Sequence, residues 1–145
     1  MVTKPQVMRR EFWVRAPAAL SFLVDEFGML GPERCDDNWR MLDLVYRGDV
    51  LECRLWLDTV ERTVGVWLVR TDGERKLIAK LRSVAKAAEL GPPVHATGAG
   101  GRTLRELDLA LDNVVGYLRP LTARLVGPEG PALMRAAGAD EWTPG

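Results

Sequence analysis

Apolar and polar residues alternate through the middle of the chain, from Met41 to Arg70. The alternation falls into three runs separated by turn residues, the first turn at Gly48-Asp49 and the second at 59–62. Alternation of this kind is typical of β-strands that bury one face in a core. The segment therefore predicts an antiparallel meander of three strands, joined by a two-residue hairpin turn and a looser turn.

The two turns determine which residues pair across the predicted strands. A two-residue turn pairs Arg47 with Val50, and the looser turn pairs Asp58 with Thr63. Both registers place the apolar residues on one common face, whereas a slip of one residue in either hairpin would mix the two faces. We therefore expect one face of the meander to lie in the core and the other to have a different character.

The second face of the meander is unusual because it carries two tryptophans and an arginine among acidic residues. In the predicted register Arg54 lies between Asp43 and Trp67, where its guanidinium can pair with a carboxylate and lie over an indole. Trp56 lies beside Gly65, where its ring can cover the glycine backbone. Two interpretations are open: a helix covers this face as a second core layer, or a partner protein binds it. The candidate binding residues are Trp56, Trp67, Arg54, Asp43, Glu52 and Met41.

Helical spacing of apolar residues flanks the meander on both sides. Apolar positions at i, i+3, i+4 and i+7 predict a helix over 17–27, with a proline in its first turn and a glycine after its last. Turn residues over 29–38 leave room for a short edge strand. After the meander a second helix is predicted over 74–90, where a Gly-Pro-Pro sequence ends it.

The longest predicted helix opens at a capping-box pattern from Thr103 to Glu106. Its apolar residues recur at alternating spacings of three and four, which is a heptad seam. Such a seam more often docks on a sheet of the same chain than forms a dimer. Pro120 predicts a kink or a break, and 131–137 predicts one or two further helical turns. The seam consists of Leu104, Leu107, Leu111, Val114, Leu118, Leu121 and Leu125.

These elements together predict an α+β fold: an N-terminal helix, an antiparallel meander of three to four strands, and two or three C-terminal helices packed on the sheet. A chain of 145 residues fits a single domain, 1–145. Within it we expect 1–10 to be mobile, 91–102 to form a Gly/Pro-rich connector and 139–145 to be a loose tail.

Charge and hydropathy bear on the cellular location of the protein and on the classes of partner it can bind. Its 20 basic and 20 acidic residues cancel, so no overall field draws in nucleic acid or an anionic membrane. No apolar run is long enough for a membrane span, and the N-terminal residues lack the apolar core of a signal peptide. We therefore predict a cytoplasmic protein with neither nucleic-acid nor membrane partners, whose two cysteines are reduced thiols.

The sequence contains no recognisable motif for catalysis, a metal or a cofactor. Two cysteines and one histidine fall short of a four-ligand zinc site, and the glycines before the long helix match neither a P-loop nor a dinucleotide fingerprint. Ser21 and Ser83 fall inside predicted helices, away from any hydrolase elbow. His95 is predicted as an exposed loop residue, although a pair with Cys35 stays open. We therefore lean toward a protein that is not an enzyme and has no cofactor.

Residues 17–70 resemble one group of bacterial proteins. A short amphipathic helix ends in DEFG at 25–28, and a strand meander follows with the turn WLDTVERTV at 56–64. This arrangement resembles small bacterial α+β proteins that are similar to toxin-immunity proteins. The resemblance is one of architecture, without a diagnostic motif, and it implies a non-enzymatic, protein-binding role.

One leading hypothesis and two alternatives follow. The leading hypothesis is a non-catalytic protein-binding domain of immunity or adaptor type, which engages its partner through Trp56, Trp67 and Arg54. The first alternative is a small-molecule-binding protein or enzyme with a pocket between the sheet and the long helix, where Glu52 or Asp43 acts as acid or base beside Arg54. The second is a homodimeric subunit of a larger assembly, joined through the heptad seam or the sheet edge.

Overall fold

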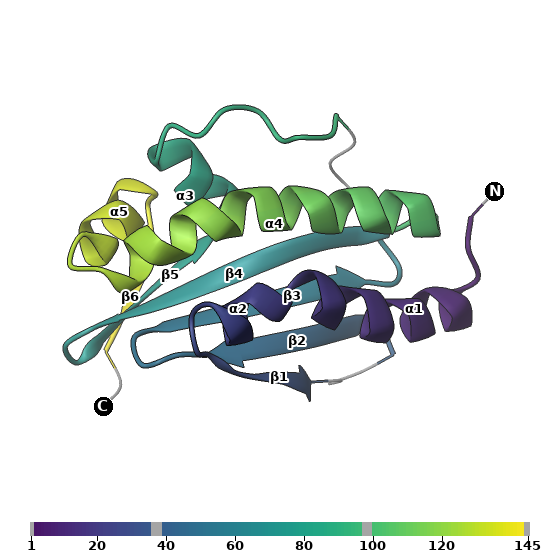
Figure 1. The fold of residues 1–145 in the computed structure, drawn as a ribbon, viewed down its shortest axis with the longest axis horizontal. Helices are drawn as coiled ribbons and strands as arrows, with labels where there is room; N and C mark the ends of the chain where they lie inside the picture. Colours follow the sequence, from purple (N-terminus) through teal and green to yellow (C-terminus); the bar gives the residue numbers. More distant parts are fainter. Residues whose placement is uncertain (1, 36–38, 97–99, 144–145) are drawn as a thin grey trace.

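A computed structural model describes residues 2–35, 39–96 and 100–143 of the chain. They form six strands and five helices in an α+β arrangement (Figure 1). The strands are antiparallel, and their order in the sheet is their order in the sequence. In chain order the elements are α1 (Pro5–Ala19), α2 (Ser21–Asp25), β1 (Leu30–Cys35), β2 (Met41–Arg47), β3 (Leu51–Asp58), β4 (Thr63–Asp72), β5 (Arg75–Lys80), α3 (Leu81–Ala87), α4 (Leu104–Val126), α5 (Gly130–Ala136) and β6 (Asp140–Trp142).

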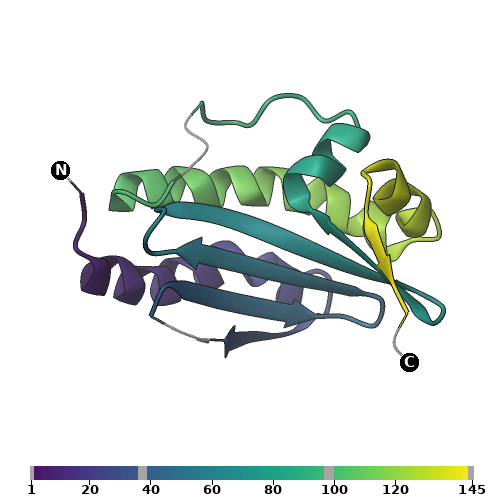
Figure 2. The same ribbon diagram turned by 180° about the vertical axis from the view of Figure 1, so that it is seen from behind.

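The long helices lie on one face of the sheet. Helix α1 runs along β1 to β3 and α4 runs along β4, while α3 and α5 pack beside α4 near β5 (Figure 1). Seen from behind, β2, β3 and β4 lie in front of α1 and α4, and none of the described helices crosses these strands on this side (Figure 2). The sheet therefore has one covered face and one face without a helical layer.

The core fills the space between the covered face and the helices. Alternate residues of the strands supply one side of it, and the heptad seam of α4 supplies the other. Every seam residue except Leu104 is buried, so the seam stabilises the fold of its own chain, as the spacing favoured. The buried hydrophobic residues of β2 to β4 on this side are Leu42, Leu44, Tyr46, Leu51, Cys53, Leu55, Leu57, Val66 and Leu68.

The register of the second hairpin is confirmed and that of the first is wrong by two residues. Asp58 pairs with Thr63 as predicted, but Arg47 pairs with Glu52 and not with Val50. The carbonyl of Val50 instead accepts a hydrogen bond from the amide of Thr71 at 2.8 Å, which draws Val50 toward β4 and lengthens the turn. Because the shift is even, every side chain keeps its predicted face.

The N-terminal helix begins much earlier than predicted. Instead of one helix over 17–27, α1 spans Pro5–Ala19 and the short α2 follows. Met8 and Phe12 are fully buried, and they lie four residues apart on one face of α1. Arg and Glu residues surround them in the sequence, which hid a narrow apolar stripe. The sequence pattern did not predict this helix, and 1–10, which includes Met8, was expected to be a mobile segment.

The predicted helix over 74–90 is also wrong in its first half. That part is β5, and only Leu81–Ala87 is helical. Leu77 and Ala79 alternate into the core, and a run this short fits a strand as well as a helix. The predicted loose tail contains β6, which pairs with β5, so the sheet has six strands and not three or four.

The predictions for the C-terminal helices hold in their main features. The hydroxyl of Thr103 accepts a hydrogen bond from the amide of Glu106 at 3.1 Å and caps α4. Helix α4 continues through Pro120 to Val126, so the break predicted as one possibility at this proline does not occur. Helix α5 occupies the segment predicted to hold one or two turns. Residues 97–99 of the predicted connector and 144–145 of the predicted tail lie outside the described residues.

Candidate functional site: the open face of the sheet

The sheet face without a helical layer carries all six candidate residues and is called the open face below. Trp56, Trp67, Arg54, Asp43, Glu52 and Met41 are all partly exposed on it. Of the two interpretations left open by the sequence, a helix covering this face as a second core layer is therefore excluded for the described residues (Figure 2). Further side chains of the open face include Glu33, Val45, Arg47, Asp58, Val69, Thr71, Lys76, Ile78, Lys80, Asp140 and Trp142.

The centre of the open face is aromatic. Trp56 and Gly65 are directly opposite each other on β3 and β4. A Cβ atom added at Gly65 would stand 2.2 Å from Cζ2 of Trp56, so the indole covers the glycine backbone, as predicted. Trp67 is the neighbouring tryptophan on β4, and the ammonium of Lys80 lies 5.3 Å from its ring centroid, within the range of a cation–π contact.

The charged residues of the first half of the open face form a connected set. Nε of Arg54 lies 2.8 Å from Oε2 of Glu52, and Nε of Arg47 lies 3.1 Å from Oε1 of the same carboxylate. Arg47 also pairs with Glu33 on β1. The hydrogen bond to Glu52 raises the pKa of Arg54, so this guanidinium stays charged. The set spans β1, β2 and β3.

Arg54 has a different environment from the one predicted. The corrected register places it opposite Val45 and not Asp43, and its carboxylate partner is Glu52. The cation over Trp67 is Lys80 of the adjacent strand β5. Asp43 lies opposite Trp56. The predicted residues therefore lie together on one face, but the pairing of β2 with β3 is shifted by two residues from the predicted register.

One side of the open face was missed because β5 and β6 were not recognised as strands. Lys76, Ile78 and Lys80 alternate along β5 on this side, and Trp142 of β6 lies next to Lys76. The ammonium of Lys76 is 6.0 Å from the ring centroid of Trp142, whose side chain is 53% exposed. The alternation of Lys76, Ile78 and Lys80 with two buried residues was the signal that could have identified this strand.

Both edges of the sheet are poor templates for pairing with another chain. Edge strand β1 contains Pro32, which has no amide hydrogen, and its register with β2 is irregular. Edge strand β6 is only three residues long. Short, interrupted and proline-containing edges are devices against edge-to-edge association. The broad accessible surface of the sheet is consequently its open face.

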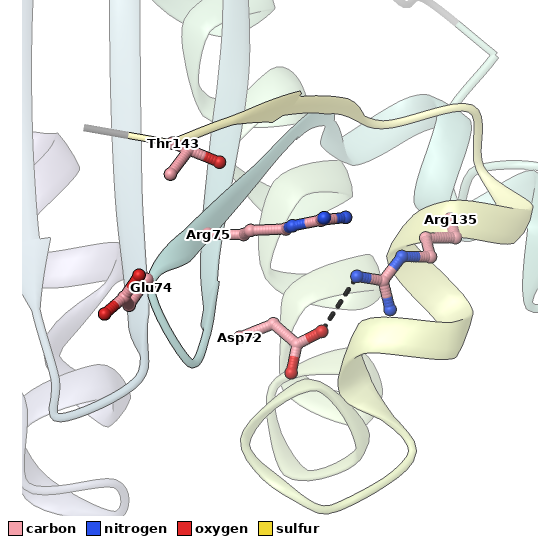
Figure 3. Close-up of a pocket in the computed structure, with 5 residues that line it drawn as sticks. All are labelled: Asp72, Glu74, Arg75, Arg135 and Thr143. Carbon is pink, nitrogen blue, oxygen red and sulfur yellow. Dashed lines mark hydrogen bonds and ion pairs between the residues drawn. The ribbon is translucent and has the colours of Figure 1, made fainter. Parts of the chain in front are cut away.

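A charged depression of about 470 Å³ lies at the far end of the sheet (Figure 3). It is formed at the β4–β5 turn, α5 and the C-terminal segment, and Nη2 of Arg135 lies 2.8 Å from Oδ2 of Asp72. Hydrogen bonds to Asp72 and then to Glu141 raise the pKa of Arg135. The charge of Arg135 is thus paired with carboxylates within the fold. The lining residues are Asp72, Glu74, Arg75, Arg135 and Thr143.

A second depression of about 200 Å³ lies between the connector and α4. Neither depression is lined by Glu52, Asp43 or Arg54. These three residues point away from α4, and buried apolar side chains fill the space between α4 and the sheet. Neither of these two depressions therefore corresponds to the pocket between sheet and helix in which these residues were considered as acid and base.

His95 is held on α4 and is only partly exposed. Its backbone amide donates to Oδ1 of Asn113 at 2.8 Å, and Nδ2 of Asn113 donates to its carbonyl at 3.3 Å. Its ring nitrogen Nε2 lies 3.4 Å from Oδ2 of Asp112. The exposed loop histidine predicted from the sequence thus has a structural role, because its contacts hold the connector on α4. None of these contacts involves Cys35, with which a pair was left open.

Comparison with models of known protein families, with curated proteins and with solved structures found no match for this chain. Within the described ranges no three His, Cys, Asp or Glu side chains are grouped closely enough to hold a metal ion. The described helices include none that is both long and apolar enough to cross a membrane. The site must therefore be interpreted from its own chemistry.

Proposed function

We propose that the chain is a non-catalytic protein-binding domain of adaptor or immunity type, and that its open face is the binding surface. The observation that carries this proposal is the pair of partly exposed tryptophans at the centre of a sheet face that no described helix covers. Tryptophan and arginine are enriched among the residues that dominate binding energy in protein interfaces, and such residues cluster near the centre of the interface. On this face Trp56, Trp67 and Arg54 are central.

The distribution of polar groups supports the same proposal. Charged side chains lie around the aromatic centre, on β1 to β3 on one side and on β5 and β6 on the other. An aromatic centre with a polar rim is typical of a protein–protein interface. Arg54 is already paired with Glu52, so binding would not bury the guanidinium of Arg54 without a carboxylate partner.

The test is partner capture by the wild-type chain and by the double variant Trp56→Ala/Trp67→Ala. Immobilised protein is exposed to extract of its source cells, bound proteins are identified, and the binding is then measured with the purified partner. We expect a loss of affinity of about 1,000-fold, since each central tryptophan contributes about 2 kcal/mol or more at a hot spot and every 1.4 kcal/mol is about tenfold. A partner bound equally by both proteins would contradict the proposal.

Trp39→Ala provides the matched control. Trp39 precedes β2, outside the strands, and its side chain is 73% exposed, so its removal is the same chemical change away from the aromatic centre. This variant should retain wild-type affinity. Thermal unfolding of all variants separates binding from folding: if the double variant unfolds at ambient temperature, its tryptophans are needed for the fold and the proposed surface is wrong.

The immunity form of the proposal makes a further demand. An immunity protein inactivates its partner, so the purified partner should have an activity that a stoichiometric amount of the wild-type chain abolishes. The Trp56→Ala/Trp67→Ala variant should leave that activity intact. Binding without any inhibition would favour the adaptor form.

A further inference from the structure

We infer that the open face binds a second copy of this chain, so that two sheets pack face to face around a twofold axis. The inference rests on the proposed function in one respect, because it requires the open face to be a protein-binding surface. It goes further by identifying the partner. The arguments are the division of charge across the face, the position of its tryptophans and its area.

The two halves of the open face carry charges of opposite sign. The half formed by β1 to β3 has an acidic excess, since Glu33, Asp43 and Glu52 outnumber Arg47 and Arg54. Asp58 is left out of this comparison because it is buried and its carboxylate accepts hydrogen bonds from Arg40 and from turn amides. The half formed by β4 to β6 has a basic excess, since Lys76 and Lys80 outnumber Asp140.

The two lysines of the basic half lack carboxylate partners in the described fold. Lys76 and Lys80 each lie over a tryptophan ring, and the ion pairs found among the described residues include neither of them. Their ammonium groups therefore remain available to acidic side chains of another molecule. The acidic half of a second copy presents such side chains.

A twofold axis that lies between the two sheets and runs parallel to the strands brings these halves together. The sheet order β1 to β6 places the middle of the sheet between β3 and β4. Rotation about an axis at this position sets the β1–β3 half of one copy against the β4–β6 half of the other, twice. Such an isologous contact is the commonest form of protein dimer, and sheets that pack face to face keep their strands within about 30° of each other.

The same axis places the tryptophans at the centre of the contact. Arg54 and Trp67 are cross-strand neighbours on either side of the middle of the sheet, and so are Trp56 and Gly65. In the dimer each Arg54 would therefore lie close to Trp67 of the second copy, and each Trp56 close to Gly65 of the second copy. The indole of Trp56 already covers Gly65 in its own chain, so the tryptophans of the two copies would meet ring against ring at the axis.

The area of the face is sufficient for a weak to moderate dimer. Strands spaced about 4.8 Å apart, with about seven residues at about 3.3 Å each, give a six-stranded sheet a flat footprint of roughly 650 Å². Projecting side chains increase the area that becomes buried, and a standard interface buries about 800 Å² per partner. The protected edges leave the face as the broad surface for self-association.

The experiment is a charge exchange followed by sedimentation velocity. One variant reverses the basic half (Lys76→Glu/Lys80→Glu), and the other reverses part of the acidic half (Glu33→Lys/Asp43→Lys). Wild-type protein should form a dimer that dissociates on dilution. Each variant alone should dimerise at least 10-fold more weakly, because like charges then oppose each other. An equimolar mixture of the two variants should recover the dimer, because every contact again joins opposite charges.

Several outcomes would overturn the inference. A wild-type chain that stays monomeric up to millimolar concentration excludes the dimer, as does a mixture of folded variants that fails to associate. If a double variant is unfolded by circular dichroism, the single reversals Lys80→Glu and Glu33→Lys take its place in the same mixing experiment. A monomer that still captures a different protein through Trp56 and Trp67 would overturn this inference and leave the proposed function standing. A dimer that no other protein displaces would support this inference and overturn the proposal that the chain is an adaptor or immunity protein.

Discussion

The indole of Trp56 occupies the space where a side chain at Gly65 would stand, with Cζ2 only 2.2 Å from the position of a Cβ atom there. The two residues pair directly across β3 and β4, at the middle of the six-stranded sheet. Glycine in a strand interior is weak because it has no side chain to pack. Here the partner ring takes that place, which explains why a glycine is tolerated at the centre of the sheet.

This relationship predicts that the sign of a Gly65→Ala substitution depends on Trp56. In the wild-type chain the added methyl displaces the ring, and we expect a loss of about 1 to 2 kcal/mol in the free energy of unfolding. In the Trp56→Ala background the same substitution should be neutral or stabilising, because alanine restricts the unfolded chain more than glycine does. Urea unfolding of the four proteins measures the coupling.

Trp39→Ala serves as the matched background for this cycle. Trp39 is not in a strand, so Gly65→Ala should keep its full cost when this other tryptophan is removed. If Gly65→Ala costs the same stability in the wild-type and Trp56→Ala backgrounds, the indole of Trp56 does not lie over Gly65 of β4.

The two hairpins show how much of the sheet could be predicted from the sequence. The β3–β4 register followed from the pairing of Asp58 with Thr63, where the turn residues match the strand alternation. The β2–β3 register failed because the backbone of Val50 bonds to Thr71, a contact between segments that pairing within one hairpin cannot reveal. Face assignment survived this error, since it depends only on whether the shift is odd or even.

The centre of the candidate site was predicted correctly, but its β5–β6 side was missed. The difference lies in the length of the strands. Trp56, Trp67 and Arg54 lie on strands whose alternation is long, so their common face could be derived. Lys80 and Trp142 lie on strands of six and three residues, where helical and extended patterns cannot be separated by periodicity. Whether a helix covers the face depends on how the elements pack in space, and no local pattern contains that information.

Tyr46 offers a test of the core beneath the open face. Its side chain is fully buried on the covered side, and its hydroxyl has no hydrogen-bond partner among the described residues. A buried polar group without a partner costs about 1 to 3 kcal/mol. Tyr46→Phe removes the group and keeps the ring, so we expect a protein at least as stable as wild type, by up to about 1 kcal/mol in thermal unfolding.

The alkaline behaviour of Tyr46 provides an independent measurement. Burial raises the pKa of this phenol to about 12, with a smaller contribution from Cys53. Because the folded-state pKa is above the ordinary value of 10.0, the unfolded chain loses this proton first, and stability falls as the pH rises between these two values. Tyr46→Phe should reduce that fall. If Tyr46→Phe is markedly less stable than wild type at neutral pH, the hydroxyl of Tyr46 has a hydrogen-bond partner and this prediction is wrong.

Arg70 joins the sheet to the end of the longest helix. It is buried, and its Nε donates to the carbonyl of Leu125 at 2.6 Å while Nη2 donates to the carbonyl of Gly127 at 3.1 Å. Carbonyls at the end of a helix have no intrahelical partner, and a cation there also interacts favourably with the helix dipole. Arg70 therefore fastens the last turn of α4 to β4.

We expect Arg70→Met to destabilise the chain by about 2 kcal/mol or more, since it leaves the buried carbonyl of Leu125 without its donor. Arg70→Lys should restore only part of this, because a single ammonium lacks the planar fork that reaches both carbonyls. Chemical unfolding measures the change in the free energy of unfolding. In the Arg70→Met variant, amide hydrogen exchange should accelerate most in the last turn of α4. The exposed Arg82 of α3 provides the control: Arg82→Met should change stability by less than about 0.5 kcal/mol. Equal effects at the two positions would contradict this role for Arg70.

Asp58 predicts how stability responds to acid. Its Oδ1 accepts hydrogen bonds from the amides of Val60 at 2.9 Å and Glu61 at 3.0 Å, and Nε of Arg40 donates to the same carboxylate. Burial raises the pKa of Asp58, but the amides of Glu61 and Val60 and the guanidinium of Arg40 outweigh this and hold the pKa below its ordinary value of 3.8. The charged form is thus preferred in the folded chain.

The sign of the acid effect follows from that preference. A carboxylate whose folded-state pKa is depressed stabilises the fold above its unfolded pKa, and this contribution is lost as the pH falls through the folded-state value. The wild-type midpoint in urea should therefore decrease below about pH 4, the ordinary range of an aspartate. Asp58→Asn should be less stable at pH 7 and lose less on acidification. Asp49→Asn, in the exposed turn between β2 and β3, should follow the wild-type profile. If Asp58→Asn and wild type respond identically between pH 5 and 2, the carboxylate does not hold the β3–β4 turn through its charge.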